Sequence, residues 1–147
     1  ISHIRNKFNL LIGERSAELV KRELGSASLA AAKELGTTDI RGRDLVSGLP
    51  QTITIDATEI YEAIKEVVAN IIQIVKETLE ETPPEISADV IDRGIVLTGG
   101  GAMLNGLTEA ISDAVDVPVF VANDPLNCVA LGTGMALSQM DVLRKRN

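Results

Sequence analysis

The segment Ile95-Val96-Leu97-Thr98-Gly99-Gly100-Gly101-Ala102-Met103 joins a short apolar run to three consecutive glycines. The apolar run over 94–98 predicts a buried strand, and a similar run over 118–122 predicts a second one. We expect a helix over about 104–115 between them, which makes a βαβ unit. Its two strands would be parallel and would need helices on both faces. Together with a further helix over about 127–139, this pattern places the chain in the α/β class.

The three glycines lie where the first strand meets the following helix. Glycine lets a ligand approach the backbone closely, and a helix N-terminus presents unpaired N–H groups. Anionic and nucleoside ligands favour the carboxyl ends of parallel strands. A tight strand-to-helix turn without a ligand fits the same residues equally well. A P-loop and a complete dinucleotide fingerprint are excluded, because no GxxxxGK[ST] occurs and Leu104 stands where GxGxxG needs its third glycine.

The N-terminal third of the chain has a different pattern. Apolar residues recur at helical spacing as far as Leu11, and Gly13 divides residues 1–24 into two short helices. We expect Gly25 to end the second helix in the left-handed conformation. Residues 28–56 contain short apolar stretches separated by glycines, which predicts the strands and turns of a small sheet.

A long amphipathic helix is predicted to begin after Asp56. The Asp56 side chain can cap the helix, with Glu59 in the capping-box position, and Pro83-Pro84 prevents continuation beyond about Glu81. At about 1.5 Å per residue this helix is roughly 40 Å long, which suits an element that joins two subdomains. A short helix over 84–91 follows. The apolar line of the long helix is expected at Ile60, Ile64, Val67, Ile71, Val75 and Leu79.

Glu18 and Lys21 are charged residues that could contact a ligand. They are three residues apart on a predicted helix, so they share a face and offer an acceptor and a donor to hydroxyl groups or to the edge of a base. From spacing alone, a solvated surface pair that contributes about a few tenths of a kcal/mol fits better. The spacing therefore leaves the binding role open.

Charge and composition exclude several classes of function. The chain has 21 acidic and 14 basic residues, a net charge of −7, and the excess lies within residues 59–92. Such a surface repels nucleic acid and anionic lipid. The single cysteine, Cys128, and the single histidine, His3, cannot form an internal disulfide or a histidine-based metal site, which fits the cytoplasm. No apolar run approaches a membrane span, and the lack of an initiator methionine predicts a piece of a longer protein.

Three motifs occur in order along the chain: Ile12-Gly13-Glu14-Arg15-Ser16-Ala17-Glu18, Ile40-Arg41-Gly42-Arg43-Asp44-Leu45-Val46-Ser47-Gly48-Leu49-Pro50, and Thr98-Gly99-Gly100-Gly101-Ala102. They closely resemble the motifs of the MreB family of bacterial actin-like cell-shape proteins, and the second is highly specific. The resemblance implies an incomplete half of an actin-like, ribonuclease H-like ATPase domain with a small inserted α+β subdomain. It assigns residues 1–75 to subdomain IIB and residues 76–147 to part of subdomain IIA.

In the family that this chain resembles, ATP lies in a cleft between two halves. The resemblance implies that this chain supplies the adenosine side of that cleft, while both phosphate loops and the groups that hold Mg²⁺ belong to the other half. No catalytic residue and no metal ligand is therefore expected here, and the chain alone should bind ATP weakly without hydrolysing it. The implied nucleotide-binding residues are Glu18, Lys21, Gly99, Gly100, Gly101 and Ala102.

The resemblance also implies a role for the parent protein. Family members self-associate into membrane-associated filaments in the cytoplasm, work with the cell-wall elongation machinery and determine rod shape. Membrane attachment generally uses the other half or an added N-terminal helix, so we expect neither direct membrane contact nor nucleic-acid binding by this chain. One alternative is an isolated, non-catalytic interaction module that binds partners through residues 28–56. The other is half of a chaperone ATPase or sugar kinase, against which residues 40–50 argue.

Overall fold

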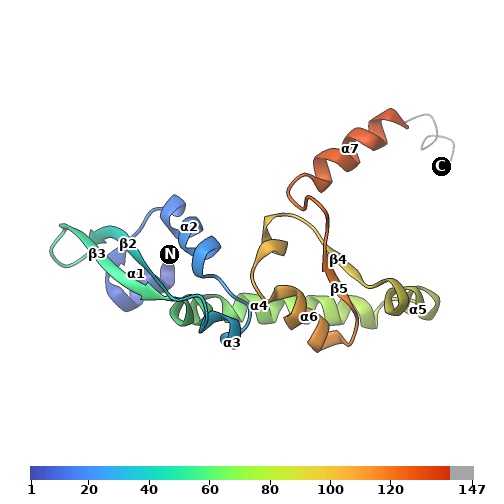
Figure 1. Ribbon diagram of the computed structural model, residues 1–147, viewed down its shortest axis with the longest axis horizontal. Helices are drawn as coiled ribbons and strands as arrows, with labels where there is room; N and C mark the ends of the chain where they lie inside the picture. Colours follow the sequence, from blue (N-terminus) through green and yellow to red (C-terminus); the bar gives the residue numbers. More distant parts are fainter. Residues whose placement is uncertain (140–147) are drawn as a thin grey trace.

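The computed structural model describes residues 1–139, and its longest element is helix α4 (Ala57–Glu80), which runs along the long axis of the molecule (Figure 1). One end carries α1 (Ser2–Phe8), β1 (Leu10–Leu11), α2 (Glu14–Leu24), α3 (Leu29–Ala32), β2 (Thr37–Asp44) and β3 (Pro50–Asp56). The rest of the chain supplies α5 (Pro84–Arg93), β4 (Ile95–Leu97), the 3-10 helix η1 (Gly100–Met103), α6 (Leu107–Val115), β5 (Val119–Val121) and α7 (Cys128–Ser138). The elements that precede α4 lie around its N-terminal end, and those that follow it pack along the rest of the helix or, like α7, extend away from it.

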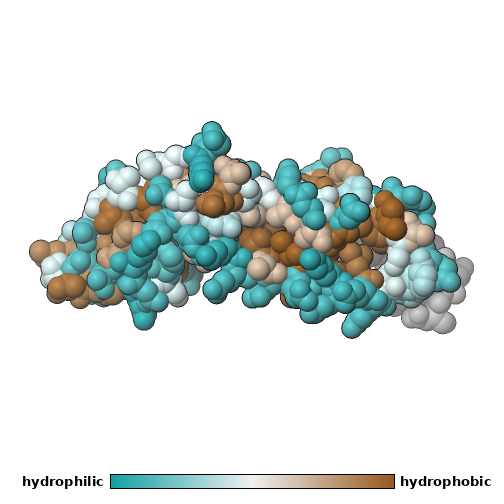
Figure 2. All heavy atoms as spheres, turned by 90° about the horizontal axis from the view of Figure 1, so that it is seen from below, coloured by the Kyte–Doolittle hydropathy of each residue, from teal (hydrophilic) through white to brown (hydrophobic). Residues whose placement is uncertain are grey.

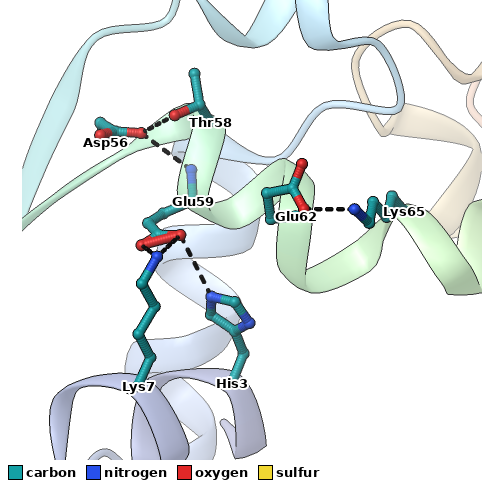
Figure 3. Close-up of polar contacts among 7 residues, drawn as sticks. All are labelled: His3, Lys7, Asp56, Thr58, Glu59, Glu62 and Lys65. Atoms are coloured by element: carbon teal, nitrogen blue, oxygen red, sulfur yellow. Dashed lines mark hydrogen bonds and ion pairs between the residues drawn. The ribbon is translucent and has the colours of Figure 1, made fainter.

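Helix α4 begins and ends where its capping signals predict. The Asp56 carboxylate accepts hydrogen bonds from the Glu59 amide at 3.0 Å and from the Thr58 hydroxyl at 2.5 Å. The Glu59 side chain does not complete the capping box. It pairs instead with Lys7, and its carboxylate lies 3.6 Å from Nε2 of His3 (Figure 3). The first turn of α4 therefore also holds α1, through the contacts of Lys7 and His3 with Glu59.

The N-terminal core lies between α1, α2, α4 and an antiparallel sheet in the order β1-β2-β3. Leu10, which is fully buried, pairs with Asp44, while Leu11 pairs with Arg43. The prediction of helix as far as Leu11 is wrong, because α1 ends at Phe8 and β1 pairs with a strand remote in the sequence. The predicted small sheet over 28–56 is confirmed, although it is preceded by the short helix α3.

The second core forms around the predicted βαβ unit. Strands β4 and β5 pair in parallel, and α6 packs between them and α4, with Val68, Leu107 and Ile111 buried at the centre. Within residues 1–139, helices cover only one face of this strand pair, contrary to expectation. Val96 and Phe120 on the opposite face are 59% and 54% exposed. Helix α7 is apolar around its whole circumference and has no buried residue.

The apolar line predicted along α4 is only partly right. Val67 and Ile71 are 59% and 38% exposed, whereas their neighbours Val68 and Ile72 pack in the second core. The two cores divide between Tyr61 and Ile64, well before residue 75. Helix α4 thus serves two cores in succession, and the assignment of the chain to two family subdomains stays a prediction.

Replacing the capping carboxylate should destabilise the fold in a pH-dependent way. We expect Asp56→Ala to lower the free energy of unfolding by about 1 kcal/mol at pH 7. The hydrogen bonds from Thr58 and Glu59 lower the pKa of Asp56, so the stabilisation is complete above the ordinary pKa of about 3.9 and disappears as the pH falls through the folded-state pKa.

Urea unfolding from pH 7 to pH 2 tests this expectation. Asp113→Ala, which removes an exposed carboxylate from α6, is the matched control and should leave stability unchanged at every pH. Equal stability of the two variants at pH 7 would contradict the capping role.

Candidate functional site

A cavity of about 510 Å³ lies between α2, the middle of α4 and the turn that follows β4. Among the predicted binding residues, Glu18 and Lys21 line it from one side and Gly100 and Gly101 from the other. Gly99 and Ala102 do not line it. The structure therefore brings together two segments that are about 80 residues apart in sequence, at a cavity in the size range of small-molecule and cofactor sites.

The α2 wall is polar and open to solvent. Val20 and Leu24 anchor this helix in the N-terminal core, which leaves Glu18, Lys21 and Arg22 on the cavity side. Glu18 and Lys21 form an ion pair at 2.7 Å, and their side chains are 56% and 48% exposed. In this arrangement they neutralise one another, and either can exchange its partner for a ligand group at little cost, because exposed pairs are weak.

The glycine turn forms the opposite wall. Gly99 has φ +81°, a conformation that favours glycine, and its amide donates to the Pro125 carbonyl at 2.7 Å. The next two amides, of Gly100 and Gly101, lie in the first turn of η1 and donate no hydrogen bond to other elements of residues 1–139. Ala102 is buried. Gly99 and Ala102 thus fix the shape of the turn, and Gly100 and Gly101 present free N–H groups.

The floor of the cavity is apolar and was not predicted. Val67 and Ile71 of α4 line it, although their helical spacing predicted core positions. Asn105 and Leu126 also contribute, from the loops before α6 and after β5. No local sequence signal marks these residues, because their positions depend on how the second core packs against α4.

A short crossing of two chain segments joins the walls. Ser26, fully buried, forms an isolated parallel bridge with Asn105, and the Ala27 amide donates to the Asn105 carbonyl at 2.7 Å. The Ser26 hydroxyl donates to the Ser28 carbonyl at 2.9 Å. Because the buried Ser26 hydroxyl and the Ala27 amide both have partners, the segment after α2 is fixed against the segment that follows the glycine turn.

Gly25 ends α2 as predicted but not in the predicted conformation. Its φ of −68° and ψ of 130° are extended, not left-handed. Glycine is needed there for a steric reason, since a Cβ would lie 2.2 Å from the Lys21 carbonyl oxygen and 3.0 Å from a methyl group of Leu104. The way the chain leaves α2 therefore depends on the absence of a side chain at this position, and the Leu104 side chain of the opposite wall packs against the space left free.

The cavity offers hydrogen-bonding groups from Glu18 and Lys21 and from the backbone of Gly100 and Gly101. The carboxyl and amino groups whose pKa is shifted, Asp44, Asp56, Lys65 and Glu109, do not line it. Across the part of the chain that the structure describes, no cluster of three or more His, Cys, Asp or Glu side chains could hold a metal ion. Among the helices of residues 1–139, none has the length and apolar character needed to span a bilayer.

Comparison with known proteins identifies relatives along the whole chain. The family model described as MreB/Mbl protein matches residues 1–145. The cell shape-determining protein Mbl of Bacillus subtilis is 51% identical over 146 residues, which are 99% of this chain and 43% of that protein. The cell shape-determining protein MreB of Escherichia coli is 42% identical over 142 residues, which are 97% of this chain and 40% of that protein. The chain spans about two fifths of the length of these relatives.

Among solved structures, MreB5 of Spiroplasma citri bound to ADP superimposes with a TM-score of 0.87 at 33% identity. The match covers 99% of this chain and 44% of that one. The resemblance that the three sequence motifs indicated is thus confirmed over nearly the whole chain, and so is the actin-like fold class.

Gly25→Ala should distort the end of α2. Because the added methyl group meets a backbone carbonyl that cannot move without disturbing α2, we expect the free energy of unfolding to fall by about 1–3 kcal/mol. The control is Gly134→Ala in α7, where a Cβ meets nothing within 4 Å and should be neutral or slightly stabilising. Thermal unfolding compares the two, and equal melting temperatures would refute the steric role of Gly25.

Proposed function

This chain belongs to the MreB/Mbl family, and on that premise we propose that it supplies the adenosine side of a nucleotide cleft in an actin-like cytoskeletal ATPase that determines cell shape. The observation that carries the proposal is the cavity in which Glu18 and Lys21 face Gly100 and Gly101. The ADP bound to the related MreB5 supports a nucleotide as the ligand.

The residues of the cavity fit a nucleoside. Glycines at 100 and 101 allow close approach to the backbone, since a Cβ at Gly101 would meet nothing within 4 Å, and the free amides beside it can donate to ligand oxygens. Across the cavity, the Glu18 carboxylate can accept from ribose hydroxyls and the Lys21 amine can donate to acceptors on the ligand. The apolar side chains of Val67 and Ile71 provide a surface for the flat face of the base.

When bound to the parent protein, ATP would supply the phosphoryl group and, together with Mg²⁺, the chemistry of phosphoryl transfer. The residues of this chain bind and orient the nucleoside and exclude water from one side of it. Hydrolysis requires charge positioned around the β and γ phosphates, which we assign to the other half of the cleft. The chain alone is therefore proposed to bind ATP weakly and to be inactive as an ATPase. In this proposal Gly99 and Ala102 contribute indirectly, because they fix the shape of the turn that carries Gly100 and Gly101.

For the parent protein we propose the role that its relatives' names describe, the determination of cell shape. The proposal includes self-association into filaments on the cytoplasmic side of the membrane and cooperation with the machinery of cell-wall elongation. The net charge of −7 supports contacts with protein rather than with anionic lipid or nucleic acid.

A second candidate function is an interaction module that needs no nucleotide. It is favoured by the hairpin between β2 and β3, where Val46 and Leu49 are 83% and 65% exposed. Chemical shifts distinguish the candidates. Nucleotide-dependent changes at residues 99–102 favour the cleft, and partner-dependent changes confined to residues 28–56 favour the module.

Substitutions in the cavity should weaken nucleotide binding. Because each removes one polar contact to the nucleoside, we expect Glu18→Ala and Lys21→Ala to raise the Kd for ADP about two- to tenfold. Gly101→Val should raise it further, since its side chain occupies the ligand's place. Titration followed by NMR measures the weak affinities.

The matched control is Leu19→Ala, which truncates an exposed side chain of α2 outside the cavity and should leave the Kd unchanged. An unaltered Kd in all three cavity variants would exclude this cavity as the nucleotide site. Phosphate release by the unmodified chain that survives Gly101→Val would exclude the assignment of hydrolysis to the other half.

A further inference from the structure

We propose that the side-chain amide of Asn105 recognises the base of the bound nucleotide and that the cavity thereby selects adenine over guanine. The inference rests on the proposed function, because it concerns the same cavity and assigns the contact that distinguishes one base from another. Asn105 lies in the loop between η1 and α6, and it lines the cavity together with Gly100 and Gly101.

An exposed polar side chain is common on this molecule and indicates nothing by itself. Figure 2 shows polar side chains along the whole length of the face that is seen from below. Asn105 differs because it is exposed and also lines the cavity of about 510 Å³. Within residues 1–139, its backbone carbonyl accepts hydrogen bonds from other segments, whereas its side-chain amide forms none. The donors and the acceptor of this amide are therefore available to a ligand.

The backbone that carries this amide is held in place. The Asn105 carbonyl accepts hydrogen bonds from the Ala27 amide at 2.7 Å and from the Ser26 hydroxyl at 3.3 Å. The next residue, Gly106, has φ +74°, and a Cβ at this position would lie 3.2 Å from the Cβ of Ser28. A short side chain on a fixed backbone loses little entropy when it binds, so the amide is suited to a specific contact.

The place of Asn105 along the cavity matches the place of the base. The bridge between Asn105 and Ser26 lies at the C-terminal end of α2, directly after Gly25. Lys21 lies four residues before Gly25, about 6 Å along the helix axis. On α2 the cavity extends from Glu18 to Gly25. If the ribose contacts Glu18 and Lys21, and the phosphates extend to the other half of the cleft, the base lies toward Gly25 and Asn105.

The chemistry of an asparagine amide distinguishes adenine from guanine. The amide carries an acceptor oxygen beside an NH₂ donor. Along one edge, adenine presents the donor N6 amino group next to the acceptor N7, and an asparagine can bind both atoms at once. Guanine presents two acceptors, O6 and N7, at the same edge. In either orientation of the amide, its oxygen then faces one of these acceptors, so guanine gains at most one hydrogen bond where adenine gains two.

The other polar side chains of the cavity lack this combination of groups. They are charged residues of α2, namely Glu18, Lys21, Arg22 and Glu23. The glutamates only accept hydrogen bonds, and the lysine and arginine only donate them. Among residues 1–139 that line the cavity, Asn105 alone has a side chain that both donates and accepts. It is therefore the side chain that matches the adjacent donor and acceptor of adenine.

Titration of the unmodified chain with three nucleotides, followed by NMR, tests the proposal directly. ADP should bind about tenfold more tightly than GDP, because a paired amide contributes about that much discrimination between bases. The analogue 7-deaza-ADP, in which a C–H group replaces N7, should bind more weakly than ADP. The side-chain NH₂ resonances of Asn105 should shift on addition of ADP and shift less with the other two. Equal Kd values for ADP and GDP would overturn the proposal.

Substitution of Asn105 should abolish the preference without disturbing the fold, because the crossing uses only its backbone carbonyl. We expect Asn105→Ala to raise the Kd for ADP about tenfold and the Kd for GDP less, so that the two bind about equally. Asn105→Asp, which replaces the donor by an acceptor that opposes N7, should do the same. The matched control is Asn70→Ala, on an exposed position of α4 outside the cavity, which should keep the preference. An adenine preference that survives Asn105→Ala would refute the contact.

The backbone amides of Gly100 and Gly101 keep this inference separate from the proposed function. Their resonances report whether any nucleotide occupies the cavity, whatever its base. If ADP and GDP shift these amides at the same concentrations and the Asn105 side chain does not respond, the cleft stands and base recognition by Asn105 is refuted. If neither nucleotide shifts them, the proposed function is refuted and this inference with it.

Discussion

The crossing of Ser26 and Asn105 is the constraint on which the arrangement of this molecule depends. One backbone hydrogen bond from Ala27 to Asn105 and one buried hydroxyl hold segments that are far apart in sequence. Without that contact, α2 would be attached to the second core only through α4, and the charged wall of the cavity would have no fixed position relative to the glycine turn. The absence of a side chain at Gly25 lets the chain leave the end of α2 in an extended conformation immediately before the crossing.

Local signals in the sequence were enough to predict most of the fold. The bounds of α4 follow from a capping aspartate and a pair of prolines, and the parallel pair β4–β5 follows from two apolar runs separated by one helix. Features that depend on distant partners were missed. A two-residue strand such as Leu10–Leu11 exists only because β2 lies beside it, and helical spacing cannot tell which of Val67 and Val68 faces a core when the helix serves two.

The residues of the candidate site also include some that the sequence predicted and some that it did not. Gly100, Gly101, Glu18 and Lys21 were named from motifs, and they do line one cavity. Val67, Ile71, Asn105 and Leu126 complete its walls, but the sequence gives no reason to group them. The glycine at position 25 was predicted for its conformational freedom and is used for close packing instead. Motifs identify the groups that meet a ligand, whereas packing decides the shape of the space that the ligand enters.

Helix α4 is shared by both cores, and this has a consequence for the dynamics of the chain. Ile60 belongs to one core, and Val68, about two turns further along the same helix, belongs to the other. Unfolding of this helix would expose both cores at once, so we expect the two halves to be coupled in unfolding. Amide protons in the middle of α4 would then exchange with solvent only in rare global openings, and those of the outlying α5 and α7 in frequent local ones.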